Sequence, residues 1–328
     1  MWFWFFEAQN DPKNAPIALV LPGTPALAGS ELVFGRNGVC AWESREPWPV
    51  ANEWTFNRHV NMLYLDTPLP AGLSFIQDAE DHSKTTKRSE VYVWNFLQVF
   101  FRYWPEYEGK QLHLWTQDFG VYFATKLAVH MLDNNQLIDK GELADQVKVN
   151  LTSLGLESPL IDVSMQYKHS LAYALENPYR AILSVEEHAE LDGEFEAIYQ
   201  RRLQACAANV ERDCEKHMAD YEYLWKKLTV GAWTSDRGIL EQKWEGRTSF
   251  DPRDIRLERP QRTFESLYDR PEHVGQLQNW LRRPAVKERL GLRRKTWDRK
   301  EDYKVFDNME KLSDSSIENV LDKEQARG

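Results

Sequence analysis

Short apolar runs alternate with longer amphipathic stretches through the first half of the chain. Five of the runs have the length of a strand: residues 2–6, 16–21, 61–66, 111–117 and 147–156. Between them, residues 87–103 and 119–132 repeat apolar side chains at helical spacing. Strands that alternate with helices predict an α/β fold, in which a mostly parallel sheet is covered by helices on both faces.

The pattern changes after about residue 162. Residues 165–230 are charged and helix-like, without a convincing strand, and residues 231–262 are rich in Arg, Asp and Pro and are predicted to be loop. Two further helices are predicted at 274–290 and 308–321. The pattern therefore predicts a core, a helical cap or insertion with its loop, and a pair of C-terminal helices: residues 1–164, 165–262 and 263–328.

Charge and composition narrow the classes of partner. The 328 residues carry a net charge of −10 that is spread along the chain, which argues against nucleic acid as the main partner. The basic run from Arg293 to Lys300 is flanked by acidic residues and is interpreted as a solvated surface. No apolar run has the length of a membrane span.

Cysteine and histidine patterns predict neither a disulfide framework nor a metal site. The three cysteines are too few for a disulfide framework. Cys206 and Cys214 are nevertheless close enough in sequence to form a disulfide across a short turn, in which case Cys40 would have no cysteine to pair with. No HExxH or paired-cysteine motif is present, so no metal or other cofactor is predicted.

The most informative stretch is WTQDFGVYF, which lies between a predicted strand and a predicted helix. In hydrolases with a nucleophile elbow, such a turn carries G-x-S-x-G with the serine at its centre. Here the centre is Asp118. Two interpretations stay open. Asp tolerates left-handed backbone and can occupy an elbow without chemistry, or its carboxylate acts as a nucleophile, which requires a histidine to activate water.

Several stretches together resemble the serine carboxypeptidase family, especially its fungal members. They are FWFFEAQNDPKNAPIAL, NEWTFNRHVNMLYLDTPLPAGLSF, YVWNFLQVFFRYWPEYEGKQLHLWTQDFGVYFATKLA and IDVSMQYK, and the likeness extends over nearly the whole chain. The resemblance implies an α/β-hydrolase fold with a helical cap and a secreted or vacuolar, serine-type peptidase. MWFWFF at the start lacks the basic region and cleavage site of a signal peptide, so no location is assigned.

The chain departs from this family at its functional positions. The family's elbow reads E-S-Y-G-G, and the resemblance places Gln117 at its Glu, Asp118 at the nucleophilic Ser, Phe119 at its Tyr and Val121 at its second Gly. Only Gly120 of this run is kept.

The resemblance also locates the groups that would bind substrate. It implies that the backbone N–H groups of Thr24 and Phe119 occupy the oxyanion-hole positions. Pro22, Arg36 and Gln117 stand where the family binds the substrate's C-terminal carboxylate, so all three side chains are changed. Arg36 is expected either to pair with Asp118 or to bind a small anionic ligand.

The family's acid and base lie in late GDxD and GHMVP stretches that this chain does not contain, so it is interpreted as truncated at both ends. No other histidine is expected to serve as the base. His113 is five residues before Asp118 and predicted to be buried, and His59 precedes a strand on the side away from the elbow.

The sequence therefore predicts a catalytically inactive serine carboxypeptidase homologue, a pseudoenzyme. The alternative is an active hydrolase or acyltransferase of the same family, with this chain a fragment or Asp118 in a changed role. The strand at 147–156 is expected to be an exposed sheet edge that could bind a protein partner. The sequon at Asn150 lies inside that predicted strand, so its glycosylation is not expected.

Overall fold

A computed structural model provides the three-dimensional description of the chain. It describes the following residues: 1–23, 28–35, 37–42, 48–83, 86–118, 120–159, 161, 163–199, 249–251, 254–259 and 271–292. The chain divides into two compact units, of which one comprises residues 1–161 and 272–328 and the other residues 162–271.

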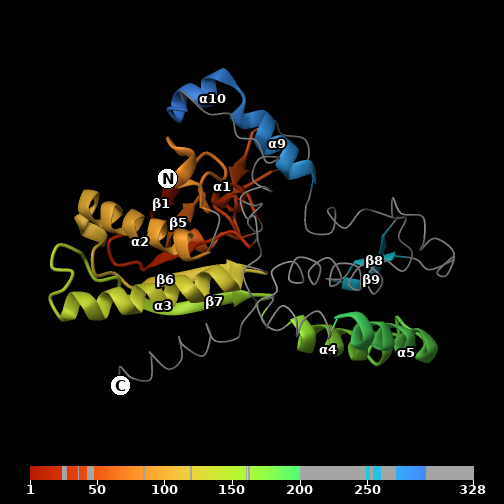
Figure 1. Ribbon diagram of the computed structural model, residues 1–328. Helices are drawn as coiled ribbons and strands as arrows, with labels where there is room; N and C mark the ends of the chain where they lie inside the picture. Colours follow the sequence, from red (N-terminus) through yellow and green to blue (C-terminus); the bar gives the residue numbers. More distant parts are fainter. Residues whose placement is uncertain are drawn as a thin grey trace. The chain divides into compact units, whose positions relative to one another are not determined.

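The first unit is built around a five-stranded sheet (Figure 1). Its strands are β1 (Phe3–Phe6), β2 (Ile17–Val20), β5 (Asn61–Leu65), β6 (Leu112–Gln117) and β7 (Leu151–Glu157). The spatial order is β1-β5-β2-β6-β7, and only β1 runs antiparallel to its neighbour. The predicted mostly parallel sheet is confirmed, and each of the five apolar runs contains one strand.

One face of the sheet packs against two long helices. These are α2 (Thr86–Tyr103) and α3 (Gly120–Asp139), which lie beside the sheet in Figure 1. Because side chains alternate along a strand, alternate residues of the central strands reach this face, and Leu19, Leu63 and Leu114 are fully buried there. At about 25 cal/mol per Å² of apolar surface, such burial is the main term that stabilises the sheet.

The opposite face packs against α9 (Pro271–Leu281) and α10 (Pro284–Arg289). Met62 and Tyr64 of β5 point to this side and join Leu277 and Leu281 of α9 in a second buried cluster. Helices therefore cover both faces, as predicted. The single helix predicted over 274–290 is instead two helices, because Pro284 has no N–H to continue a helix and begins α10.

The segment before β7 also differs from its prediction. A strand was expected from residue 147, but β7 begins at Leu151. The side-chain amide of Gln98 accepts from the Val147 N–H (2.7 Å) and donates to its carbonyl (3.0 Å). Asn135 makes the same pair of bonds to Val149, at 2.9 and 2.7 Å. Two helix side chains thus satisfy backbone groups that a neighbouring strand would otherwise satisfy.

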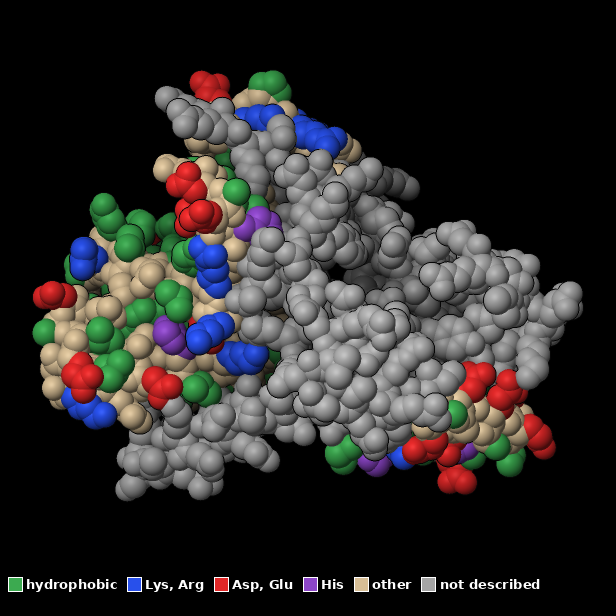
Figure 2. All heavy atoms as spheres, in the orientation of Figure 1, with side chains coloured by type: hydrophobic (Ala, Val, Ile, Leu, Met, Phe, Trp, Pro, Cys, Tyr) green, Lys and Arg blue, Asp and Glu red, His purple; other side chains and the backbone are tan. Residues whose placement is uncertain are grey.

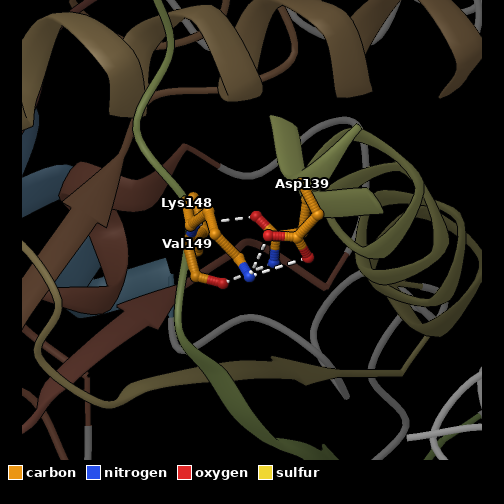
Figure 3. Close-up of polar contacts among 4 residues, drawn as sticks. Asp139, Lys148 and Val149 are labelled. Atoms are coloured by element: carbon orange, nitrogen blue, oxygen red, sulfur yellow. Dashed lines mark hydrogen bonds and ion pairs between the residues drawn. The ribbon is translucent and has the colours of Figure 1, made fainter. Parts of the chain in front are cut away.

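An ion pair holds the same segment from outside. Lys148 Nζ lies 2.7 Å from Asp139 Oδ1 at the end of α3 (Figure 3). Both side chains are more than half exposed, at 53% and 59%. An exposed pair of this kind contributes less than about 1 kcal/mol, so the buried amides rather than the ion pair fix the segment.

The shorter elements of the first unit connect these layers. They are α1 (Gly29–Leu32), β3 (Cys40–Ala41), β4 (Val50–Ala51), η1 (Phe56–Arg58), η2 (Ala79–Asp81) and η3 (Pro105–Tyr107). Cys40 in β3 is a free, half-buried cysteine, and burial raises the pKa of its thiol.

The second unit contains α4 (Val163–Leu175), α5 (Val185–Glu194) and the π-helical turn η4 (Phe195–Tyr199). Tyr167 stacks on Phe195 at a ring separation of 4.8 Å, which joins α4 to η4. Figure 2 shows Asp and Glu side chains gathered over α5, whose sequence is VEEHAELDGE. Part of the segment predicted as loop is instead a hairpin of β8 (Ser249–Asp251) and β9 (Asp254–Arg259).

No helix within the described ranges is both long and apolar enough to cross a membrane.

Candidate functional site

The turn between β6 and α3 has the backbone of a nucleophile elbow. β6 ends at Gln117, α3 begins at Gly120, and Asp118 between them has a φ of +48°. A positive φ is costly for most residues with a side chain and is tolerated best by Asn and Asp. The Asp118 N–H donates to the carbonyl of Glu157 at 3.0 Å, an ordinary length for a backbone hydrogen bond. The sharp turn is therefore kept with an aspartate at its centre.

Two glycines let the loop after β2 approach this turn. A Cβ on Gly120 would lie 2.0 Å from Thr116 Oγ1 and 2.7 Å from the Pro22 carbonyl oxygen. A Cβ on Gly23 would lie 2.5 Å from Gln117 Cγ. Both positions therefore require glycine. The consequence is that Pro22, Gln117 and Asp118 meet at one edge of the sheet, where the carboxyl ends of β2 and β6 lie together.

Burial differs among these three positions. Pro22 is buried, whereas Gln117 and Asp118 are half-buried and retain access to solvent. Val121, in the first turn of α3, is only 1% exposed. An isopropyl group thus stands directly after the elbow, where the resemblance implies a glycine.

Five of the predicted site residues lie outside the residues that the structure describes. They are Thr24, Arg36, Phe119, Cys206 and Cys214. The oxyanion-hole N–H groups, the two roles for Arg36 and the disulfide therefore stay predictions. Asn150 is described: it is exposed, lies one residue before β7 rather than within it, and its Nδ2 donates to the Gly109 carbonyl at 3.1 Å.

The histidines closest to the elbow in sequence have other partners. His113 was predicted to be buried, but it is partly exposed, because its side chain leaves the α2–α3 face of the sheet. Its Nδ1 lies 2.7 Å from Ser153 Oγ on β7. His130 Nε2 lies 3.1 Å from Asn134 Nδ2, and burial lowers the pKa of the imidazole. These contacts support structural roles for both side chains.

A buried carboxylate beside the site was missed by sequence reasoning. Asp66 follows β5 directly and is fully buried. Its Oδ1 accepts from the Ser30 N–H (2.6 Å), and its Oδ2 accepts from the Ser30 hydroxyl (2.8 Å) and the Leu73 N–H (2.7 Å). The signal that could have found it is an aspartate directly after the apolar run Met62–Leu65, at the end of a strand, where parallel sheets place functional groups.

The chemistry available to the site is that of a carboxylate at a strained turn. Attack of a carboxylate on a peptide carbonyl would expel an amine and form an anhydride. An anhydride is less stable than the ester that a hydroxyl forms, so this reaction is less favourable than acyl transfer to a serine. Among the described residues, no group of three or more His, Cys, Asp and Glu is placed to hold a metal ion.

Comparisons with known proteins agree with this geometry. A sequence model of the serine carboxypeptidase family matches residues 1–327. Carboxypeptidase S1 of Penicillium janthinellum is 33% identical over 183 residues, which is 56% of this chain and 42% of that protein. Carboxypeptidase Y of Schizosaccharomyces pombe is 27% identical over 200 residues, covering 60% of this chain and 20% of that protein. The chain thus spans less than half the length of either curated relative.

The fold has a counterpart among solved structures. Kex1(delta)p, a prohormone-processing carboxypeptidase from Saccharomyces cerevisiae, aligns with a TM-score of 0.62 and 16% sequence identity. The alignment covers 98% of this chain and 63% of that one. This likeness shows the α/β-hydrolase fold, and the match of the sequence model over residues 1–327 shows the family. The chain belongs to the serine carboxypeptidase family.

Proposed function

We propose that this chain is a serine carboxypeptidase-like protein that does not hydrolyse peptides. The observation that carries the proposal is Asp118 at φ +48° in the turn between β6 and α3. By resemblance this turn carries the nucleophile, and its side chain here is a carboxylate instead of a hydroxyl.

Electrostatics oppose peptide hydrolysis at such a turn. The serine mechanism needs a neutral hydroxyl that gives up its proton as it attacks, whereas an ionised carboxylate has no proton to give. Its negative charge would also lie next to the oxyanion that forms during attack, and like charges at close range raise the barrier. The substitution therefore removes the nucleophile and opposes the transition state.

The positions around Asp118 support the same conclusion. By resemblance, Pro22, Arg36 and Gln117 replace the groups that bind the substrate's terminal carboxylate. Pro22 has no side-chain donor at all, and Gln117 cannot share a proton with a neighbouring acid as the family's Glu does. Loss of both the nucleophile and the recognition groups is expected of a protein released from peptidase function.

A covalent probe tests the proposal. The purified chain is incubated with a fluorophosphonate, which labels activated serines, and its intact mass is measured. We expect no adduct on the wild-type chain, because a carboxylate stands at residue 118, and none on Asp118→Ser, because the described His113 and His130 have other partners. An adduct on the wild-type chain would reveal an activated serine and would overturn the proposal. An adduct on Asp118→Ser alone would show that the remaining machinery is functional and that the loss rests on Asp118.

A second candidate function is favoured by the same turn. Asp118 is half-buried and held in the conformation from which an elbow residue acts as a nucleophile. A carboxylate attacks saturated carbon more readily than it attacks an amide, and it forms an ester by displacing a halide or opening an epoxide. This candidate is a hydrolase or acyltransferase with Asp118 in a changed catalytic role.

Mass spectrometry separates the two candidates. After incubation with a small epoxide, a nucleophilic Asp118 would gain the mass of the whole reagent, and the adduct would map to the β6–α3 peptide. Asp118→Asn keeps the shape of the side chain and is the matched control. Wild-type protein without the adduct would exclude the second candidate.

A further inference from the structure

The sequence contains a single Asn-x-Ser/Thr sequon, formed by Asn150, Leu151 and Thr152. A sequon of this kind is the acceptor for N-linked glycans, which lie on the surface of a folded protein. The predicted place of this sequon inside a strand argues against its use. The structure removes that objection, because β7 begins at Leu151 and Asn150 precedes the strand.

Asn150 lies at the centre of a tight turn. The Leu151 N–H donates to the Val149 carbonyl at 2.8 Å, which closes a three-residue γ-turn directly before β7. The Asn150 carbonyl accepts from the N–H of Leu112, at the start of β6, at 2.8 Å. These two bonds fix the backbone of the turn and leave the side chain of Asn150 outside the sheet.

The side chains of the sequon alternate between solvent and core. Asn150 and Thr152 are exposed, whereas Leu151 between them is only 8% exposed and belongs to the main core. The Thr152 hydroxyl donates to the Asn150 carbonyl at 3.2 Å, so it lies beside the asparagine. The amide and the hydroxyl that define the sequon therefore both reach solvent, and the buried leucine anchors them.

The Asn150 amide has room for a sugar. Its Nδ2 donates one hydrogen to the Gly109 carbonyl at 3.1 Å. An asparagine amide has two hydrogens, so a glycan can replace the other one while this bond stays. Gly109 is itself exposed, with a φ of +72°, and a Cβ on it would meet nothing within 4 Å. The surface beside the amide is therefore open.

We propose that Asn150 is an N-glycosylation site, used when the chain passes through the secretory pathway. The co-substrate is an oligosaccharide joined to a lipid pyrophosphate. A bond forms between Asn150 Nδ2 and the anomeric carbon of the first sugar, and the bond from that carbon to the phosphate oxygen breaks. The lipid pyrophosphate leaves with the electron pair, and Nδ2 gives up one proton to the transferring enzyme.

The glycan would lie at the opposite end of the sheet from the elbow. Asn150 bonds to Leu112 at the start of β6, whereas Asp118 follows the end of the same strand. At a rise of about 3.3 Å per residue, the strand separates the two sites by about 20 Å. The proposal is therefore independent of the chemistry at Asp118, and its test can fail without affecting the proposed function.

Secretion of the full chain from yeast, behind an added signal peptide, tests the proposal. We expect the intact mass to exceed the 38.5 kDa of the bare chain and to return to it after digestion with peptide N-glycosidase F. In heavy-oxygen water, this digestion should convert residue 150 into an oxygen-labelled aspartate, which peptide mass spectrometry locates. Cells and medium are both analysed, so a chain that is retained in the cell still reports its glycan.

Thr152→Ala and Thr152→Ser form a matched pair of variants. Both keep Asn150 and its bond to Gly109, but the alanine variant loses the hydroxyl and should lose the glycan completely, whereas the serine variant should retain it. Asn14→Gln changes an exposed asparagine outside the sequon and should also retain the glycan. A wild-type chain without a glycan in cells and medium would overturn the proposal. So would a glycan that persists in Thr152→Ala, or an added mass that resists the glycosidase.

Discussion

Replacement of Asp66 by Asn should destabilise the first unit strongly, although the two side chains have nearly the same shape. Asp66 connects the end of β5 to α1 and to the loop after β5, through the three hydrogen bonds that it accepts from Ser30 and Leu73. The Ser74 hydroxyl donates to its carbonyl at 2.7 Å. No solvent reaches the side chain, whose exposure is 0%.

The size of this destabilisation follows from the groups that donate hydrogen bonds to Asp66. Two are backbone N–H groups, which cannot turn to accept a bond, and they approach different carboxylate oxygens, Oδ1 and Oδ2. An asparagine has one oxygen, so one N–H must face an NH₂ group and lose its acceptor, at a cost of about 1–3 kcal/mol. The remaining bond loses its charge assistance, about 1 kcal/mol more. The free energy of unfolding should fall by about 2–4 kcal/mol.

Urea denaturation followed by tryptophan fluorescence measures this change. Asp78→Asn is the matched control, because Asp78 is exposed and its side chain makes no capping bond. The free energy of unfolding of this control variant should stay within about 0.5 kcal/mol of the wild-type value. If Asp66→Asn is as stable as Asp78→Asn, the three bonds do not hold β5, α1 and the following loop together, and the reasoning is wrong.

Three further outcomes are expected. Gly120→Ala should lower the free energy of unfolding by at least about 1–3 kcal/mol, because its Cβ would lie 2.0 Å from Thr116 Oγ1. A Cβ on Gly193 meets nothing within 4 Å, so the control Gly193→Ala should leave the melting temperature unchanged or raise it. Burial lowers the pKa of His130, so its imidazole binds a proton more readily in the unfolded chain than in the folded one. The free energy of unfolding should therefore be fully present above about pH 6.5 and fall below it. Denaturation curves at about pH 5 and 7.5 should differ less for His130→Gln than for the wild-type chain. Titration calorimetry with acetate and benzoate tests anion binding at Arg36: heat that disappears in Arg36→Ala supports it, and no heat above background excludes it.

The sheet and the elbow could be predicted because both depend on local pattern. The apolar runs that became β5 and β6 are bounded by turn residues, and the step from a strand to a helix around Asp118 predicted a sharp turn there. Tertiary hydrogen bonds explain the failures. Val147 and Val149 looked like a strand, but their backbone is bonded by amides from α2 and α3, 49 and 14 residues away in sequence.

The candidate site was predictable only in part, for a related reason. Sequence identified Pro22 and Gln117 through the resemblance, and the structure brings them together at the elbow. Asp66 was missed because its donors, Ser30 and Leu73, lie 36 and 7 residues away and become neighbours only in the folded sheet. Its place at the end of a buried strand was the one local sign, and that sign does not by itself show that the side chain is fully buried.

The central claim is that an elbow with Asp118 does not support peptide hydrolysis. The most direct measurement is the release of C-terminal amino acids from N-blocked dipeptides by the purified chain, with Asp118→Asn prepared in parallel. The account predicts equal background release from both proteins across pH 4 to 8, a range that brackets the ordinary pKa of His. Saturable release by the wild-type chain that is lost in Asp118→Asn would contradict it.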